Sequence, residues 1–310
     1  MLPAFATDLS YNALLAVTGD DAAEFLHAQF TNDVESLAAG QAQWSGWCTA
    51  KGRLVATFLL LRRADGFLIM LPAEIAAPFA KRLSMFILRS KVKIADVSDA
   101  HGLIGIAGDG AAPIVGARWG AVPAPMTSLE KDGGTCVALD AQRFVAIVPA
   151  ATARAALDEL AKGARRGDRD QWEWAAIQAG VPTIVAATQE AFVPQMANFD
   201  LVGGVSFRKG CYPGQEIVAR TQYRGILKRR MALAHVEGSE RPQPGQSVYS
   251  SAFGDQAAGT VVNVASSPGG GFDALVVAQI ESLERGDLRW NAPDGPRIEI
   301  LRQPPLAKAS

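Results

Sequence analysis

The apolar run Phe67-Leu68-Ile69-Met70-Leu71-Pro72 decides the fold class, because the chain repeats its pattern. Phe144-Val145-Ala146-Ile147-Val148-Pro149 begins 77 positions later, and apolar residues at helical spacing follow each run. In the first copy these residues are Ile75, Phe79, Leu83 and Phe86, and in the second copy they fall around residues 155–160. A short apolar run predicts a buried strand, and the proline marks the corner that leads into a helix. Strands and helices mixed in this repeated way predict an α+β domain with ferredoxin-like pieces.

Two further patterns lie before the first copy. Ala13–Val17 is typical of a strand, and helical spacing of apolar residues follows over Ala22–Phe30. The stretches Gln43–Thr49 and Leu54–Leu61 predict a hairpin, joined by the turn Ala50-Lys51-Gly52-Arg53. Glycine suits a tight turn because it tolerates positive φ, so Gly52 is expected to take that position.

The character of the chain changes near residue 230. Short β-like runs separated by Gly- and Pro-rich turns follow, at 231–236, 247–250, 259–264, 274–280 and 297–301. Such a pattern without helical periodicity predicts a small all-β barrel or sandwich. We therefore expect an α+β domain over 1–230, with discontinuous subdomains, a C-terminal β-barrel over 231–304, and a frayed tail over 305–310.

The composition narrows the functional classes. The net charge is −1 and the sequence pI is about 6.3, which disfavours a protein that grips nucleic acid through its phosphates. Three cysteines without a CxxC pair and three dispersed histidines argue against a disulfide framework and against a self-contained zinc or cluster site. No apolar run is long enough to span a membrane, and no secretory signal is recognisable at Met1. We expect a soluble, cytoplasmic protein.

The segment Lys209-Gly210-Cys211-Tyr212-Pro213-Gly214-Gln215-Glu216 is the most unusual in the chain. Its glycines and proline predict a tight loop that leads into a short helix. Cys211 would then lie just ahead of a helix N-terminus and near Lys209, surroundings that favour a reactive thiolate. The alternative is a small buried hydrophobe. Glu216 fits a pair with Arg220 at i,i+4 or a capping role, and the spacing does not decide between them.

Residues 192–229, FVPQMANFDLVGGVSFRKGCYPGQEIVARTQYRGILKR, closely resemble the signature of the YgfZ family. Thr31-Asn32-Asp33-Val34, the turn at 50–53 and Ile177–Pro182 also resemble that family. The resemblance implies a fold similar to the glycine-cleavage aminomethyltransferase, with a folate-binding α+β body followed by a small β-barrel. It further implies tetrahydrofolate or a derivative as cofactor, iron–sulfur proteins as clients, and a role in tRNA modification through a cluster enzyme.

The resemblance also assigns residues. Cys211 is the signature cysteine and the candidate reactive thiol, and the rest of the signature loop comprises Lys209, Gly210, Tyr212, Gly214, Gln215, Glu216 and Arg220. Trp172 matches a tryptophan linked to the folate pocket, although a plain packing role is the alternative. Lys51 and Arg53 are candidates to meet an anionic glutamyl tail, or are ordinary surface charges.

The chain departs from the family pattern at two places, and from the aminomethyltransferase pattern at a third. Asn12 stands where a second pocket tryptophan is expected, and Thr49 stands where some relatives carry aspartate. Ala56 and Thr57 stand where an aminomethyltransferase is expected to carry its carboxylate pair, and neither can act as an acid or base. An accessory role is therefore favoured, and a folate-dependent aminomethyltransferase or demethylase is the alternative. A nucleic-acid-binding module and an adaptor with an inert Cys211 are further alternatives.

Overall fold

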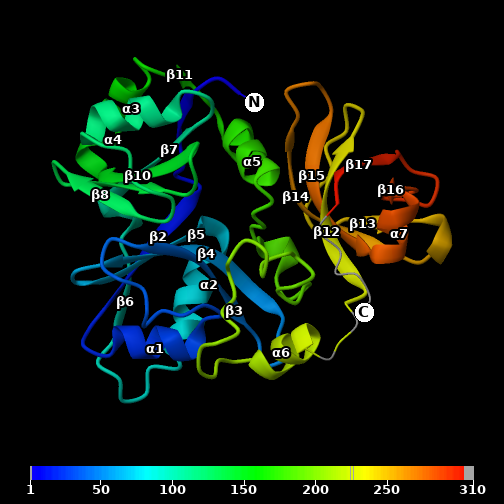
Figure 1. Ribbon diagram of the computed structural model, residues 1–310, viewed down its shortest axis with the longest axis horizontal. Coiled ribbons are helices and arrows are strands. Elements are labelled where there is room, and N and C mark those ends of the chain that lie inside the picture. The colour runs from blue at the N-terminus through cyan, green and yellow to red at the C-terminus, as the bar shows by residue number, and fades with distance from the viewer. Residues whose placement is uncertain (1, 224, 226, 304–310) are drawn as a thin grey trace. The chain divides into compact units, whose positions relative to one another are not determined.

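A computed structural model describes residues 2–223, 225 and 227–303 (Figure 1). The contacts within it divide the chain into two compact units, both discontinuous in sequence. The first unit comprises residues 1–45, 58–175 and 208–212, and the second comprises 46–57, 176–207 and 213–310. The division therefore passes through the signature segment, between Tyr212 and Pro213. The predicted tail at 305–310 lies outside the described residues.

A five-stranded sheet carries the first strand–proline–helix copy. Its strand order is β3-β4-β5-β2-β6, and the pairs β2–β5, β4–β5 and β2–β6 are antiparallel. The strands are β2 (Asn12–Thr18), β3 (Ala42–Cys48), β4 (Leu54–Arg63), β5 (Gly66–Pro72) and β6 (Lys93–Asp96). The helices of this copy are α1 (Ala22–Gln29) and α2 (Ala73–Ser84), and α2 packs on β2, β5 and β6. The predicted hairpin turn is confirmed, with Gly52 at φ +69°.

A six-stranded sheet, in the order β11-β1-β7-β10-β9-β8, carries the second copy. Its strands are β1 (Phe5–Asp8), β7 (His101–Ala107), β8 (Ser128–Lys131), β9 (Gly134–Ala138), β10 (Arg143–Pro149) and β11 (Arg165–Arg166). The helices are α3 (Ala111–Trp119) and α4 (Ala150–Leu160), and the short helix η1 (Ser98–Ala100) precedes β7. Both helices pack on β7 and β10, where they cover one apolar cluster. Another apolar cluster contains residues from both sheets, including Leu14, Leu68 and Val145.

The repeat predicted from the sequence is confirmed as β5–α2 and β10–α4. The two prolines occupy the N-cap positions of their helices with nearly identical backbone angles, φ −55° at Pro72 and φ −57° at Pro149. Proline serves at this corner because its fixed φ suits the passage from strand to helix, and its missing N–H costs no helical hydrogen bond.

The second unit is built around a curled sheet in the order β16-β13-β14-β15-β12-β17. Its strands are β12 (Arg229–Val236), β13 (Ser247–Tyr249), β14 (Gly259–Ser266), β15 (Phe272–Gln279), β16 (Arg289–Trp290) and β17 (Ile298–Arg302). The sequence predicted a barrel, and the structure corrects this to a half-barrel. Among the described residues, Arg289 of β16 forms an isolated bridge with Arg297, the residue before β17, and the two edge strands share no continuous ladder.

The remaining helices are α5 (Arg169–Gln178), η2 (Ala186–Thr188), α6 (Gln215–Tyr223), η3 (Ser251–Phe253) and α7 (Ile280–Arg285). Helix α6 confirms the short helix predicted after the signature loop. Helix α7 and strand β16 were not predicted, because the sequence between the last two β-like runs shows no clear periodicity. Across the described part of the chain, no helix has the length and apolar character needed to cross a bilayer.

Candidate functional site

Lys209 fastens the first half of the signature loop to the C-terminus of α1. Its ammonium group donates hydrogen bonds to the carbonyl oxygen of His27 and, at 2.7 Å, to that of Phe30. A cation is favourable there, because the last carbonyls of a helix lack intrahelical partners and carry partial negative charge. The Tyr212 ring covers the ammonium group, with its centroid 5.0 Å from Nζ.

The ammonium group of Lys209 is largely shielded from solvent, since the residue is only 8% exposed. Burial lowers the pKa of Lys209 to about 8, while the nearby charges of Asp33, Glu35 and Cys211 act in the opposite direction. The lysine therefore contributes a structural anchor, with its donors committed to backbone carbonyls.

Cys211 comes two residues later and is exposed, whereas Cys48 and Cys136 are buried. Burial raises the pKa of both other thiols, that of Cys136 to about 12. Only a thiolate acts as a nucleophile or metal ligand, so Cys211 is the cysteine placed for chemistry. Among the described residues, no cluster of three or more His, Cys, Asp or Glu side chains could hold a metal ion.

The second half of the signature loop belongs to the second unit and packs on the turn at 49–53. Gly214 has φ +81°, and a Cβ atom there would lie 2.3 Å from the carbonyl oxygen of Thr49 and 2.6 Å from the Cα atom of Gly52. Both the conformation and the close backbone approach require glycine. The carbonyl oxygen of Gly214 then accepts hydrogen bonds from the backbone N–H groups of Ile217 and Val218, which starts α6.

Lys51 and Arg53, the two candidates for binding an anionic glutamyl tail, lie on this same turn but differ in their contacts. Arg53 donates to the carbonyl oxygens of Ala191 at 2.7 Å and Glu190 at 3.3 Å, so its guanidinium braces the backbone. Lys51 is exposed at the tip of the turn. The structure thus leaves Lys51 as the better placed of the two for an anionic ligand.

Gln215 is half-buried, and Glu216 and Arg220 are exposed on α6. Between these two described side chains there is no ion pair, so the i,i+4 pair considered from the sequence does not form. Helix α6 is held instead by Gln195, which is buried and donates from Nε2 to the carbonyl oxygen of Val218 at 2.8 Å. Gln195 lies within the signature block, but nothing in its spacing singles it out.

Trp172 lies on α5 in the first unit and is only 6% exposed. Its indole ring packs directly on Gly105 of β7, where an added Cβ atom would lie 2.5 Å from the ring. The ring belongs to the apolar cluster that contains residues from both sheets of this unit. Only glycine leaves room for the ring at position 105, and nothing in the sequence indicated that Gly105 and Trp172 are in contact.

The positions expected to carry an aminomethyltransferase's carboxylate pair have structural roles here. Ala56 is fully buried, and Thr57 is 4% exposed. The Thr57 hydroxyl donates to the carbonyl oxygen of Pro182 at 2.9 Å and accepts from the N–H of Ile184 at 3.0 Å. The hydroxyl group thus donates one hydrogen bond and accepts another, both within the protein.

Comparison with known proteins shows which family this chain resembles. The GCVT N-terminal domain family matches residues 4–122. The chain is 34% identical over 248 residues to tRNA-modifying protein YgfZ of Shigella sonnei, covering 79% of this chain and 76% of that protein. It belongs to the YgfZ family. The YgfZ protein of Cronobacter sakazakii is 35% identical over 250 residues, covering 80% of this chain and 76% of that protein.

A solved structure supports the same fold. The glycine cleavage system aminomethyltransferase T of Bartonella henselae aligns over 99% of this chain and 87% of its own, with a TM-score of 0.78 and 18% identity. The YgfZ-family chain described here therefore has the aminomethyltransferase fold, as the sequence resemblance predicted.

Proposed function

We propose that this YgfZ-family protein binds tetrahydrofolate or a derivative and supports the assembly or repair of iron–sulfur clusters in client proteins. Through clients that modify tRNA, it would support tRNA modification. The observation that carries the proposal is the presentation of Cys211, an exposed thiol on a loop that Lys209 anchors to α1.

An anchored loop matters because a reactive group works best when its position is fixed before its partner arrives. The hydrogen bonds of Lys209 and the packing of Tyr212 fix the residues on both sides of Cys211. Iron–sulfur clusters generally take four thiolate or equivalent ligands, and Cys211 supplies one. Contact with a cluster is therefore transient and depends on ligands from the client.

Folate binding is supported by the fold shared with an aminomethyltransferase and by the family relationship. Trp172 is the residue we assign to it, for aromatic contact with the pterin or benzoyl ring. When bound, the folate would supply a one-carbon unit or reducing equivalents. Ala56 and the hydrogen-bonded Thr57 favour the accessory role over methylene transfer to or from an amine.

The test of the folate proposal is anaerobic calorimetric titration of tetrahydrofolate. Trp172→Ala would open a large cavity, so Trp172→Phe is the better variant, with Trp119→Phe as the control because Trp119 is equally buried on α3. We expect micromolar binding by the wild type and Trp119→Phe, and about 2- to 10-fold weaker binding by Trp172→Phe. Absence of binding to the wild type would remove folate from the proposal.

The test of the thiol is cellular. In a strain that lacks the endogenous protein, we expect Cys211→Ser to fail in restoring the tRNA modification, while Cys136→Ala, which alters a buried thiol, restores it. Folate titration of Cys211→Ser should be unchanged. Full restoration by Cys211→Ser would favour the adaptor alternative with an inert cysteine.

A further inference from the structure

The loop after α2 exposes an unusual concentration of large apolar side chains. Met85, Phe86 and Leu88 are 71%, 45% and 87% exposed, and they lie within four consecutive positions. Single exposed apolar residues are normal on a protein surface, but contiguous ones mark interaction sites. These three side chains contribute little to the core.

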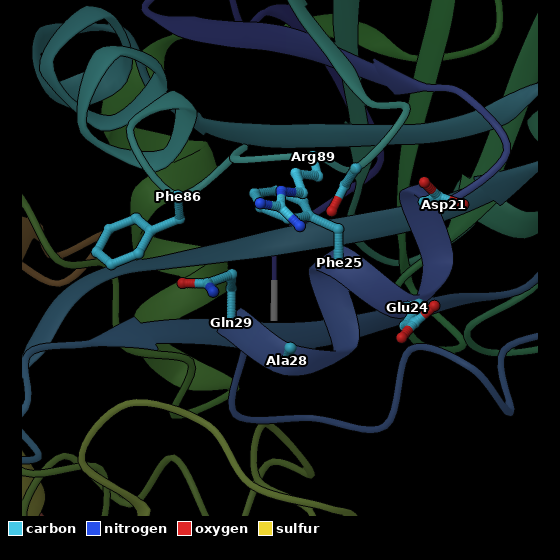
Figure 2. Close-up of a pocket in the computed structure, with 8 residues that line it drawn as sticks. Asp21, Glu24, Phe25, Ala28, Gln29, Phe86 and Arg89 are labelled. Atoms are coloured by element: carbon cyan, nitrogen blue, oxygen red, sulfur yellow. The ribbon is translucent and has the colours of Figure 1, made fainter.

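A recess of about 400 Å³ adjoins this loop (Figure 2). One helical face of α1 and the loop residues 86–90 form its walls, with the lining residues Asp21, Glu24, Phe25, Ala28, Gln29, Phe86, Arg89 and Ser90. In Figure 2 the Phe86 ring and the Gln29 amide lie at one end of the recess and the two carboxylates at the other. The recess thus has an aromatic ring and an uncharged amide at one end and two carboxylates at the other.

The segment around the apolar side chains is strongly basic. From residue 75 to residue 95 it contains no Asp or Glu, and its cations, all exposed, are Lys81, Arg82, Arg89, Lys91 and Lys93. Lys91 is already committed, because its ammonium group lies 3.2 Å from Asp20. Lys81 precedes the three apolar residues, and Arg89 and Lys93 follow them. These exposed cations favour an acidic partner.

We infer that α1 and the loop 85–92 form a docking surface for an acidic amphipathic segment of a partner protein. An apolar side chain of the partner enters the recess beside Phe25 and Phe86, and carboxylates of the partner face Arg89 and Lys93. A lipid surface fits less well, because a flat bilayer does not fill a recess.

The position of this surface connects it with the signature loop. The helix that forms one wall of the recess carries, at its C-terminus, the carbonyl oxygens of His27 and Phe30 that hold Lys209. Cys211 comes two residues after that lysine. The identification of the docked partner as an iron–sulfur client rests on the proposed function, whereas the docking surface itself rests on the residues of α1 and the loop.

The experiment is photo-crosslinking in cells with the full chain. A photo-reactive phenylalanine analogue replaces Leu88 in one strain and Glu130, an exposed residue of β8, in the control strain. We expect Leu88 to crosslink to an iron–sulfur protein through an acidic segment mapped by mass spectrometry. The double variant Arg89→Glu and Lys93→Glu should reduce this product about tenfold, since it turns two attractions into repulsions.

Three results would overturn the inference: no product above the Glu130 control, a mapped segment without acidic residues, or a product that the double variant leaves unchanged. Sedimentation with phosphatidylglycerol vesicles that the double variant abolishes would assign the surface to lipid instead. Folate titration of the double variant separates the two proposals. Loss of crosslinking with unchanged folate binding concerns docking alone, and a wild type that crosslinks without binding folate contradicts only the folate proposal.

Discussion

The two strand–proline–helix copies of the first unit share a corner and differ in the segment that leaves the helix. Pro72 and Pro149 occupy the same N-cap position, and Leu83 and Leu160 close the two helices from equivalent buried positions. After α2 the chain exposes the apolar loop 85–92, whereas α4 is succeeded by a short polar turn at 161–163. The proline corners and buried leucines that the copies share therefore determine the fold. The segments after the helices differ, and there one copy is able to serve a separate function.

The helices also differ in how they fill the core. Phe79 of α2 packs against Phe58, with ring centroids 5.6 Å apart, and against Phe30 at 6.3 Å. The equivalent residue of α4 is Ala156, which lies in the apolar cluster that includes Trp119. A large side chain in one copy and a small one in the other show that each copy is packed for its own neighbours.

The largest expected change in the free energy of unfolding comes from removing this difference in packing. Phe79→Ala should lower the free energy of unfolding by about 3–5 kcal/mol, because it removes an aromatic ring from a buried cluster. The reciprocal Ala156→Phe should cost about 1–3 kcal/mol through overpacking. Urea unfolding followed by circular dichroism measures both. A neutral Phe79→Ala would show that the aromatic cluster does not stabilise the first copy.

The next effect tests the equivalence of the two helix ends. Leu83→Ala and Leu160→Ala should each cost about 2–5 kcal/mol, since both side chains are buried. We expect the two costs to agree within about 1 kcal/mol, because the two leucines occupy equivalent buried positions. The remaining difference reflects how far each cavity collapses. A difference well beyond that in the same urea experiment would mean that the copies are equivalent in backbone only.

A smaller effect compares two lysines at helix C-termini. Lys209 binds carbonyls at the end of α1 from a buried position, and Lys131 donates to the carbonyl oxygen of Arg118 in α3 from an exposed one. Burial lowers the pKa of Lys209 to about 8, while an unfolded chain's lysine titrates near 10.4. Between these pH values the unfolded state binds more protons, so the free energy of unfolding rises with pH.

The measurement is the difference in free energy of unfolding between the wild type and Lys209→Met at pH 7.5 and pH 9.5. The difference should shift in favour of the wild type at the higher pH. Lys131→Met serves as the control for the loss of one charge at a helix end. A Lys209→Met difference that is independent of pH would contradict the burial of a charged ammonium group.

The smallest expected effect concerns the exposed loop. Met85→Ser and Leu88→Ser should change the free energy of unfolding by less than about 0.5 kcal/mol, as is usual at the surface. Thermal unfolding checks this directly. A loss of several kcal/mol would show that these side chains stabilise the first copy itself and would weaken the case for a docking surface.

Local chemistry made much of the fold predictable. The prolines at the strand–helix corners, Gly52 in its turn and the short helix after Gly214 result from backbone preferences that the residues impose wherever they occur. The half-barrel was predicted as a barrel, because strand periodicity indicates how many strands form but not whether the edges pair. Closure depends on the residues between β16 and β17, whose sequence carries no such signal.

The location of some candidate residues was predictable from the sequence, whereas their contacts were not. Cys211 was expected on a loop before a helix and is found there, exposed. The signature implied that Lys209 matters, but its partners are carbonyl oxygens of α1, and backbone acceptors leave no trace in a sequence. The same holds for Arg53 and the carbonyls of residues 190 and 191. The burial of Trp172 against Gly105 depends on a contact between residues 67 positions apart.

Thr57 restricts which side chains its position accepts. Its hydroxyl donates to the carbonyl oxygen of Pro182, and an aspartate at the same position has no proton to give at neutral pH. A single substitution to an acid would place a buried negative charge against a carbonyl oxygen. A carboxylate at this position would therefore require the segment around Pro182 to change as well.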